Sequence, residues 1–361
     1  MKYDEFFGEV MREIKLRDSL HYKRIGKRMD ALLAASTIAP RESGGCGSGN
    51  SHDAAKLELC SSKQSHRERE RERENGKRCE QSHTGTPPSD QLLAFEELCA
   101  LITAYCRDTA VTPARLADHY LWLVNIYRIE AVYFFEHGSY RCKNQAEADA
   151  AVYSNRELME RYMHFLLLTQ ALWQAHFDTY LYLTDRLEKH IKTDAPTVLE
   201  IGPGHGFFSR LINNRYPSAA LDLVDISAQS LEMSRKMVGE GERIRYINGN
   251  VFEFDGKYDL IILGEVLEHL DSPRQILRKI SELLSERGIL WITVPTNSPA
   301  PDHVYLFRSR SEVLAMIEES GLSVIESGGF PADGFDEQTA NERKLTVMVG
   351  AFCAPKTTKE Q

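Results

Sequence analysis

Glycines at alternate positions, Gly202, Gly204 and Gly206, separate the apolar run "TVLEI" from the amphipathic run "FFSRLINNR". Glycine tolerates positive φ and lets a ligand approach the main chain closely. In an open parallel sheet, ligands bind outside the carboxyl ends of the strands. A glycine turn that directly follows a buried strand therefore predicts a place where a ligand lies against the backbone.

Histidines follow two later strand-like runs. His269 lies in "EVLEHL", after "YDLIILG", and His303 lies in "NSPAPDHVYLF", after "GILWITVP". Both should stand at the same edge of the sheet as the glycine turn, where a positioned base can add about 10²–10⁴-fold to a rate. We predict both as catalytic candidates, with Asp302 influencing the protonation of His303. The alternatives are a loop-fixing role for His269 and an ordinary surface position for His303.

The elements that position these residues can be predicted from the pattern beyond Pro196. Short β-branched runs alternate there with amphipathic helical runs, which predicts a parallel sheet with helices on both faces. The last two strand-like runs, "GLSVIESGG" and "RKLTVMVGAFC", have no helical pattern between them and predict a terminal antiparallel hairpin. The expected fold class is α/β, a Rossmann-like, seven-stranded, mostly parallel sheet preceded by an all-helical domain.

Composition divides the chain into four segments. Residues 1–39 predict an N-terminal helix, and residues 40–90 are rich in glycine, serine and charge, with the run "RERERERENGKR". That second segment has few apolar side chains to offset the entropy of ordering, so we expect a disordered low-complexity insertion. Its alternating charges suit a solvated spacer, and a partner-binding arm is the alternative. Residues 91–193 predict a helical domain and residues 194–355 the sheet domain.

Composition also limits the partners and the compartment. The net charge of −9 over 361 residues argues against a nucleic-acid surface, and no apolar run is long enough for a membrane span. The charged amino terminus has no secretory pattern, and the 7 cysteines form no CxxC pair, which favours reduced thiols in a cytoplasmic protein. We expect no metal; a zinc site on Cys46, Cys60 and Cys79 is the alternative.

Several motifs, in order along residues 190–353, resemble those of the class I S-adenosylmethionine-dependent methyltransferases. "VLEIGPGHG" is similar to their first motif, "LVDIS" to the acidic end of their second strand, and "INGN" to the segment beside adenine. "YDLIILGEVLEHL" is similar to the fourth-strand signature of the ubiquinone/menaquinone-type branch, and "LSERGILWITVP" to the passage into the fifth strand. The resemblance implies that residues 194–355 bind S-adenosylmethionine.

Each matching residue then has an implied role. Glu200 would accept a hydrogen bond from the cofactor ammonium, and Asp225 would accept from the ribose hydroxyls; the alternatives are to hold the glycine loop and to cap a helix, which Ser227 could also do. Ile226 and Val251 would enclose adenine. The full set of cofactor-binding candidates is Glu200, Gly202, Gly204, Gly206, Asp225, Ile226, Asn250, Val251 and Glu265. Asn250 departs from the aspartate that is frequent in the family.

The helical region supplies candidates for the acceptor site. Residues 155–192 predict one long helix, and an aromatic stripe on the preceding helix could line a pocket or simply pack in the core. The resemblance implies that such helices cover the cofactor and form a substrate cap. The substrate-binding candidates are Tyr120, Tyr127, His137 and Tyr140. For His137, satisfying a helix end is the simpler account.

These features predict a methyltransferase that acts on a nitrogen or oxygen of a small-molecule metabolite, without nucleic-acid or membrane partners. The helical domain could also mediate a homodimer. One alternative is a cofactor-binding protein without turnover. Another is a nicotinamide-dependent oxidoreductase, although the dinucleotide pattern needs a small residue where this chain has Phe207.

Overall fold

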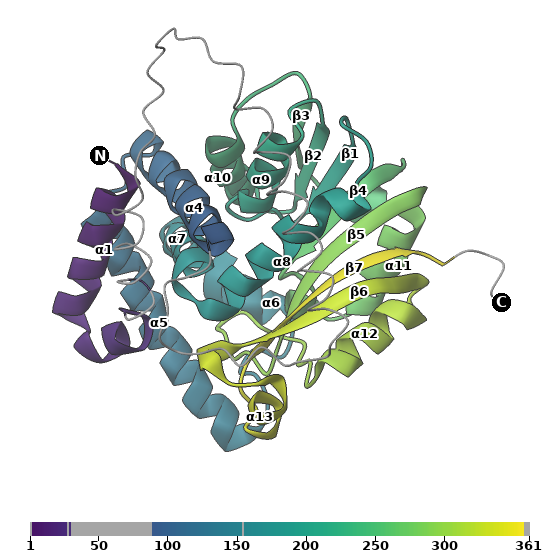
Figure 1. Ribbon diagram of the computed structural model, residues 1–361. Coiled ribbons are helices and arrows are strands. Elements are labelled where there is room, and N and C mark those ends of the chain that lie inside the picture. Colours follow the sequence, from purple (N-terminus) through teal and green to yellow (C-terminus); the bar gives the residue numbers. More distant parts are fainter. Residues whose placement is uncertain (1, 27–28, 30–88, 154, 357–361) are drawn as a thin grey trace, which may run out of the picture.

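A seven-stranded sheet forms the centre of the carboxyl-terminal half of the protein, with strand order β3-β2-β1-β4-β5-β7-β6 (Figure 1). The computed structural model describes residues 2–26, 29, 89–153 and 155–356. The strands are β1 (Thr197–Ile201), β2 (Ala220–Asp225), β3 (Ile244–Asn248), β4 (Tyr258–Gly264), β5 (Leu284–Thr296), β6 (Leu322–Pro331) and β7 (Val347–Pro355). Strands β1 to β5 pair in parallel, and β7 runs antiparallel to both β5 and β6. The predicted fold class is confirmed.

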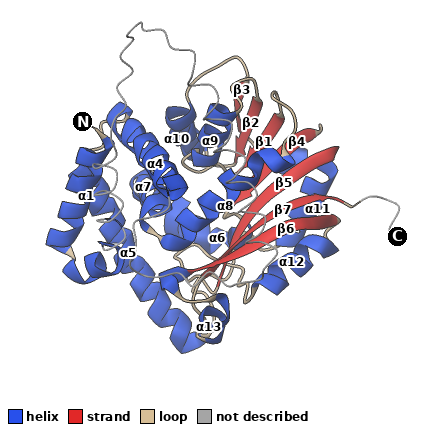
Figure 2. Cartoon of the chain, in the orientation of Figure 1, coloured by secondary structure: helices blue, strands red, loops and turns tan. Residues whose placement is uncertain are grey.

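Helices cover both faces of the sheet because successive strand residues point to opposite sides. Val198 of β1 packs in one apolar cluster and its neighbour Leu199 in the other. The first cluster includes side chains of α8 (Gln174–His190), α9 (Phe207–Arg215) and α10 (Ala228–Val238). The second includes side chains of α11 (Pro273–Leu283) and α12 (Arg310–Glu319). Figure 2 shows this layering of helices around the strands.

The hairpin contains helical turns that the sequence pattern did not predict. A 3₁₀ turn, η5 (Ala332–Gly334), and a short helix, α13 (Glu337–Glu342), lie between β6 and β7. The side chain of Asp336 caps α13 by accepting from the Thr339 amide at 2.9 Å. The helix has 6 residues and is mostly polar, so it is too short to show an apolar periodicity.

The amino-terminal half consists of helices packed beside the sheet (Figure 1). They are α1 (Tyr3–Arg17), α4 (Ser89–Asp108), α5 (Pro113–His137), α6 (Gln145–Ala148), the π-helical η2 (Asp149–Tyr153) and α7 (Arg156–Leu172). Thr112 caps α5 by accepting from the Arg115 amide at 3.2 Å, and Gly138 ends that helix with a φ of 67°. Phe7, Phe165 and Trp291 belong to one buried cluster, so the helices and one sheet face share a core.

Two predicted helices are broken. The helix predicted over residues 1–39 ends at Arg17; residues 19–26 are helical again, after Asp18 has turned the chain and accepted from the His21 amide at 2.8 Å. The helix predicted over 155–192 is two helices, separated at Trp173, where φ is −94° and ψ is 127°. The Trp173 indole donates to Tyr120 Oη at 2.9 Å, a tertiary contact that no local pattern reveals.

The predicted insertion over residues 40–90 lies outside the described residues, apart from its last positions, where α4 already begins at Ser89. Among the helices that the structure describes, none combines the length and apolar character that crossing a membrane would require.

Candidate active site

The glycine turn lies between β1 and α9. Gly202, Gly204 and Gly206 have φ values of 65°, 54° and 77°, which side-chain-bearing residues rarely adopt. A Cβ on Gly206 would lie 2.8 Å from Ser234 Cα, and one on Gly204 would lie 3.2 Å from Met163 Sδ. Backbone conformation and close packing against α10 and α7 therefore both require glycine in this turn at the sheet edge.

Glu200 joins β1 to the first turn of α9. One of its carboxylate oxygens accepts from both the amide and the hydroxyl of Ser209. Burial raises the pKa of Glu200 to about 8. These contacts tie β1 to the first turn of α9, directly after the glycine loop. Both roles named for Glu200, holding that loop and bonding a cofactor ammonium, stay predictions.

Asp225 ends β2 beside the glycine turn. Its Oδ1 accepts from the Ser227 amide at 2.8 Å, and burial raises its pKa. Ser227 itself caps α10 by accepting from the Ser230 amide at 3.2 Å, so the helix does not need Asp225 as its N-cap residue. Ile226, next in the chain, is 64% exposed. An acceptor carboxylate and an open apolar side chain thus lie together, as an adenosine would require.

The end of β3 completes this corner. Asn250 caps the 3₁₀ turn η3 (Val251–Glu253) and uses its side-chain oxygen to accept from the Phe252 amide at 3.1 Å. Val251 is buried, whereas the aromatic ring of Phe252 is 46% exposed. Phe252 is a candidate for stacking on a base that sequence reasoning missed, although its position directly after Val251 was a usable signal.

Strained backbone marks the ends of β4 and β5. Glu265 and Asn297 have φ values of 53° and 45°. Non-glycine residues held in this region cluster at functional sites. Glu265 donates its amide to the Thr293 carbonyl at 3.0 Å, and its Oε2 lies 3.8 Å from His176 Nε2 of α8. The side chain therefore lies between the sheet edge and the helical region.

Asp302 is the centre of a buried polar cluster beyond β5. It accepts from the hydroxyls of Tyr153 and Tyr162, each at 2.7 Å, and its Oδ2 lies 3.3 Å from His269 Nδ1. Burial acts to raise the pKa of Asp302, but the nearby His269 and His303 and the two tyrosine hydroxyls lower it overall. Asp302 is therefore an ionised carboxylate enclosed by protein.

The two predicted histidines meet in this cluster, with ring centroids 4.9 Å apart. His303 Nδ1 lies 2.6 Å from the Ser298 carbonyl, and burial and the neighbouring His269 lower the pKa of His303 to about 4. Burial acts to lower the pKa of His269 as well, but Asp302 and Glu268 raise it overall. His303 is therefore neutral at pH 7, with a lone pair on Nε2.

Of the predicted substrate wall, two residues lie at this cluster. Tyr140 Oη accepts from the Ser298 amide at 2.9 Å, and its ring lies 5.6 Å from that of His303. Tyr127 packs its ring against Phe165 with centroids 5.1 Å apart, and burial raises the pKa of its hydroxyl, which lies beside Tyr162, the residue that bonds Asp302.

The other two predicted wall residues lie elsewhere. Tyr120 Oη bonds His21 and Trp173 inside the helical core. His137 stacks on Tyr133 with centroids 4.1 Å apart and bonds the carbonyl of that residue at the end of α5. Sequence reasoning did not single out Tyr153 and Tyr162, because nothing local shows that they reach a loop so far along the chain.

Comparisons with known proteins agree with this geometry. Residues 172–327 match the family model described as a methyltransferase domain. The chain is 27% identical over 176 residues to malonyl-[acyl-carrier protein] O-methyltransferase of Halalkalibacterium halodurans, a match that covers 45% of this chain and 64% of that protein. It is 28% identical over 182 residues to ribosomal protein uL3 glutamine methyltransferase of Neisseria meningitidis, which covers 38% of this chain and 60% of that protein.

Among solved structures, the chain is similar to N-methyltransferase NodS from Bradyrhizobium japonicum in complex with S-adenosyl-L-homocysteine. The identity is 19%, the match covers 49% of this chain and 87% of that one, and the TM-score is 0.38. The chain spans less than two thirds of the length of the two curated relatives named above, 64% of the first and 60% of the second.

Proposed function

We propose that this chain, which belongs to the class I S-adenosylmethionine-dependent methyltransferases, transfers a methyl group to an oxygen or nitrogen of a small-molecule metabolite. The observation that carries the proposal is the cluster of Asp302, His303 and His269, which lies under the helical region at the same sheet edge as the glycine turn; Asp302 and His303 are buried, and the side chain of His269 is 17% exposed. Enclosure of this kind suits a small acceptor, because a folded macromolecule could not reach the buried side chains of Asp302 and His303.

The residues at the sheet edge fit the cofactor. When bound, S-adenosylmethionine supplies an electrophilic methyl group on its sulfonium sulfur. The open backbone at 202–206 would hold the amino-acid end, Asp225 the ribose, and the exposed side chains of Ile226 and Phe252 the adenine. Holding donor and acceptor in line can supply several kcal/mol of the barrier reduction.

The acceptor end needs a group that can take a proton when the nucleophile is a hydroxyl or an ammonium. His303 is neutral at pH 7 and can accept a proton at Nε2, since its Nδ1 bonds the Ser298 carbonyl. Asp302 positions His269 through Nδ1 and balances any positive charge that forms in the cluster. We assign base or acceptor-positioning roles to the two histidines.

The names of the two curated relatives refer to acceptors that are attached to a protein or part of one, a malonyl-[acyl-carrier protein] and a glutamine of ribosomal protein uL3. The enclosed cluster favours a small molecule over a protein side chain for this chain. The family membership favours methyl transfer over nicotinamide chemistry, and binding without turnover remains the competing function. We place the reaction in the cytoplasm, which the buried free thiols of Cys99, Cys106, Cys142 and Cys353 support.

The test is to incubate the purified chain with methyl-labelled S-adenosylmethionine and a cell extract separated into small-molecule and macromolecular fractions. Label should enter a product in the small-molecule fraction, and His303→Ala should reduce its rate while leaving the affinity for S-adenosylhomocysteine unchanged. Label confined to the macromolecular fraction would contradict the substrate class. Tight cofactor binding with no transfer in either fraction would favour the competing function.

A further inference from the structure

The carboxyl edge of β4 and β5 brings together three side chains of the types that bind divalent metals. Glu268 and His269 lie in the 3₁₀ turn η4 (Leu267–His269), and His303 lies in the loop after β5. One ligand atom of each lies within 4.8 Å of the others. Metal–ligand bonds of about 2.1 Å separate neighbouring ligands by about 3 Å, so small side-chain movements would close this group around an ion.

Both histidines are held with one ring nitrogen free. His303 Nδ1 lies 2.6 Å from the Ser298 carbonyl, and His269 Nδ1 lies 3.1 Å from the Asp302 carbonyl and 3.3 Å from its carboxylate. These partners accept hydrogen bonds, so each Nδ1 carries a proton and Nε2 is the ring atom that is left to bind an ion. Histidines that ligate metals are oriented in the same way, by a carboxylate or carbonyl on the second nitrogen.

Glu268 supplies the observation that points to a missing partner. Its side chain is 0% exposed, and neither carboxylate oxygen has a hydrogen-bond partner among the described residues. A buried carboxylate without hydrogen bonds is costly. Glu268 Oε1 lies 3.8 Å from His269 Nε2, a separation too long for a hydrogen bond but suited to two ligands of one ion.

The backbone keeps this group assembled. The Glu268 carbonyl accepts from the amides of Val304 at 2.8 Å and Tyr305 at 2.9 Å, which ties η4 to the loop that carries His303. A Cβ on Gly202 would lie 3.0 Å from Val266 Cγ2, so the same turn also adjoins the glycine loop. An ion at this place would therefore lie beside the acceptor end of a bound cofactor.

We propose that Glu268, His269 and His303 form a binding site for a divalent transition-metal ion, and that this ion holds the oxygen of a hydroxyl-bearing acceptor. Two imidazoles and a carboxylate with open positions suit Mn²⁺, Fe²⁺ or Zn²⁺. The metal site replaces the sequence-based expectation of no metal. The role of the ion in holding the acceptor oxygen rests on the proposed methyltransferase function.

The ion would act by lowering the pKa of the bound hydroxyl, as it does for bound water. With Nε2 of His303 bound to the ion, the ion takes over the role assigned above to that histidine as a base: the hydroxyl proton leaves to solvent, and the oxygen forms a bond to the methyl carbon. The sulfur–carbon bond breaks as that bond forms, and its electron pair stays on sulfur, which becomes a neutral thioether. The products are an O-methyl compound and the demethylated cofactor, so atoms and charge balance without an oxidant or reductant.

The experiment is a titration of the EDTA-treated full chain with Mn²⁺, followed by electron paramagnetic resonance of the free ion and by calorimetry, and repeated with Fe²⁺ and Zn²⁺. One equivalent should bind. Glu268→Gln and His303→Asn should each weaken that binding by about 10- to 100-fold or more. His137→Asn removes an exposed imidazole outside the cluster and should leave it unchanged.

Circular dichroism and titration with S-adenosylhomocysteine show whether each variant is folded. No stoichiometric binding of any of the three ions, or equal binding by folded Glu268→Gln and His303→Asn, would overturn the site. A labelled product methylated on nitrogen or carbon would overturn the acceptor class. If the parent chain binds the metal but not S-adenosylhomocysteine, that result would instead count against the proposed methyltransferase function.

Discussion

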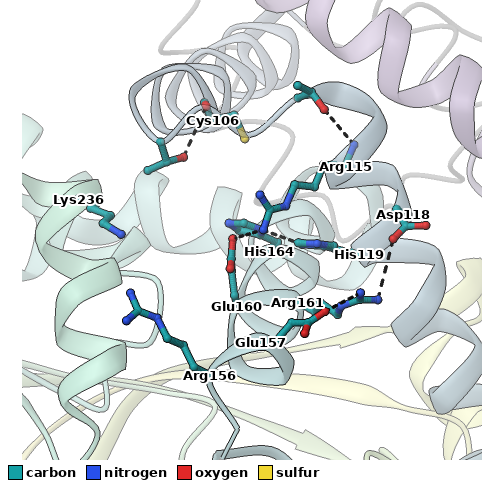
Figure 3. A network of polar contacts seen from close by, with 12 residues as sticks. Cys106, Arg115, Asp118, His119, Arg156, Glu157, Glu160, Arg161, His164 and Lys236 are labelled. Carbon is teal, nitrogen blue, oxygen red and sulfur yellow. Dashed lines mark hydrogen bonds and ion pairs between the residues drawn. The ribbon is translucent and has the colours of Figure 1, made fainter.

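The protein contains two largely enclosed histidine pairs that differ in what surrounds them. In the helical region His119 of α5 stacks on His164 of α7, with ring centroids 5.0 Å apart, planes 14° apart and their Nδ1 atoms at 2.8 Å (Figure 3). At the sheet edge His269 and His303 are nearly perpendicular, with an angle of 81°. The first pair is bonded ring to ring, whereas each ring of the second bonds an oxygen acceptor and keeps Nε2 free.

The two pairs also differ in the direction of their pKa shifts and in the charges near them. Burial, together with Arg115, lowers the pKa values of His119 and His164, that of His164 to about 3. The sheet-edge pair lies beside the buried, ionised carboxylate of Asp302 and next to Glu268, whose pKa burial raises to about 8. We therefore predict reactivity only for the sheet-edge pair, in which each Nδ1 bonds an oxygen acceptor and Asp302 supplies buried negative charge.

The largest expected effect comes from removing that negative charge. Asp302→Asn should lower the single-turnover rate of methyl transfer by about 10²–10⁴-fold, because His269 loses its charged partner. Affinity for S-adenosylhomocysteine, measured by calorimetry, should stay the same. Asp118→Asn, which changes an exposed carboxylate that ion-pairs with Arg17 on the helical side, is the matched control. A rate close to that of the parent protein would remove the distinction between the two pairs.

The next largest effect is expected from a change at the predicted cofactor end of the site, which should affect cofactor affinity. Asp225→Ala should weaken binding of S-adenosylhomocysteine by about 10- to 100-fold, since hydrogen bonds to a charged acceptor are lost. Binding is measured by calorimetry on folded protein. Glu242→Gln, an exposed carboxylate in the loop after α10, should bind as the parent does. Unchanged affinity in Asp225→Ala would refute the ribose assignment.

The helical pair should instead control stability against acid. The pKa of His164 falls from an ordinary 6.5 to about 3 on folding, so the unfolded chain binds more protons below pH 6.5. Stability should be complete above pH 6.5 and decrease as the pH falls toward 3. Between pH 6.5 and 5 the loss from His164 is about 2 kcal/mol.

Urea denaturation at pH 7 and pH 5 measures this effect. His164→Gln should show a smaller decrease in the free energy of unfolding than the parent, because the titrating group is absent. His137→Gln, at the exposed end of α5, should decrease as the parent does. Equal pH dependence in all three proteins would show that the His119–His164 pair is not the acid-sensitive element.

The smallest effect is expected from deleting residues 42–88, which lie outside the described residues. Because the sequence offers few apolar side chains there, the melting temperature should move by less than the ~2–4 °C that 1 kcal/mol produces. Differential scanning calorimetry and cofactor titration would check this. A large loss of melting temperature would show that the segment packs against one of the two regions compared here.

The sequence alone predicted the sheet and the position of its glycine turn. β-branched runs alternating with amphipathic helices determine a parallel sheet, and the glycine spacing after β1 determines where the backbone adopts positive φ. Both are local patterns, because strand and helix periodicity are expressed within about ten residues. The same holds for the expectation that His269 and His303 lie on one edge, which follows from strand direction.

Only the tertiary structure decided which side chains meet at that edge. Tyr153 and Tyr162 reach Asp302 from helices about 140 residues earlier in the chain. Trp173 breaks a helix to reach Tyr120, and Glu268 lies buried without a hydrogen bond. Sequence periodicity indicates which face of an element is apolar but not which distant element covers it. Side-chain contacts and burial depend on that covering, and so do the charges on buried groups.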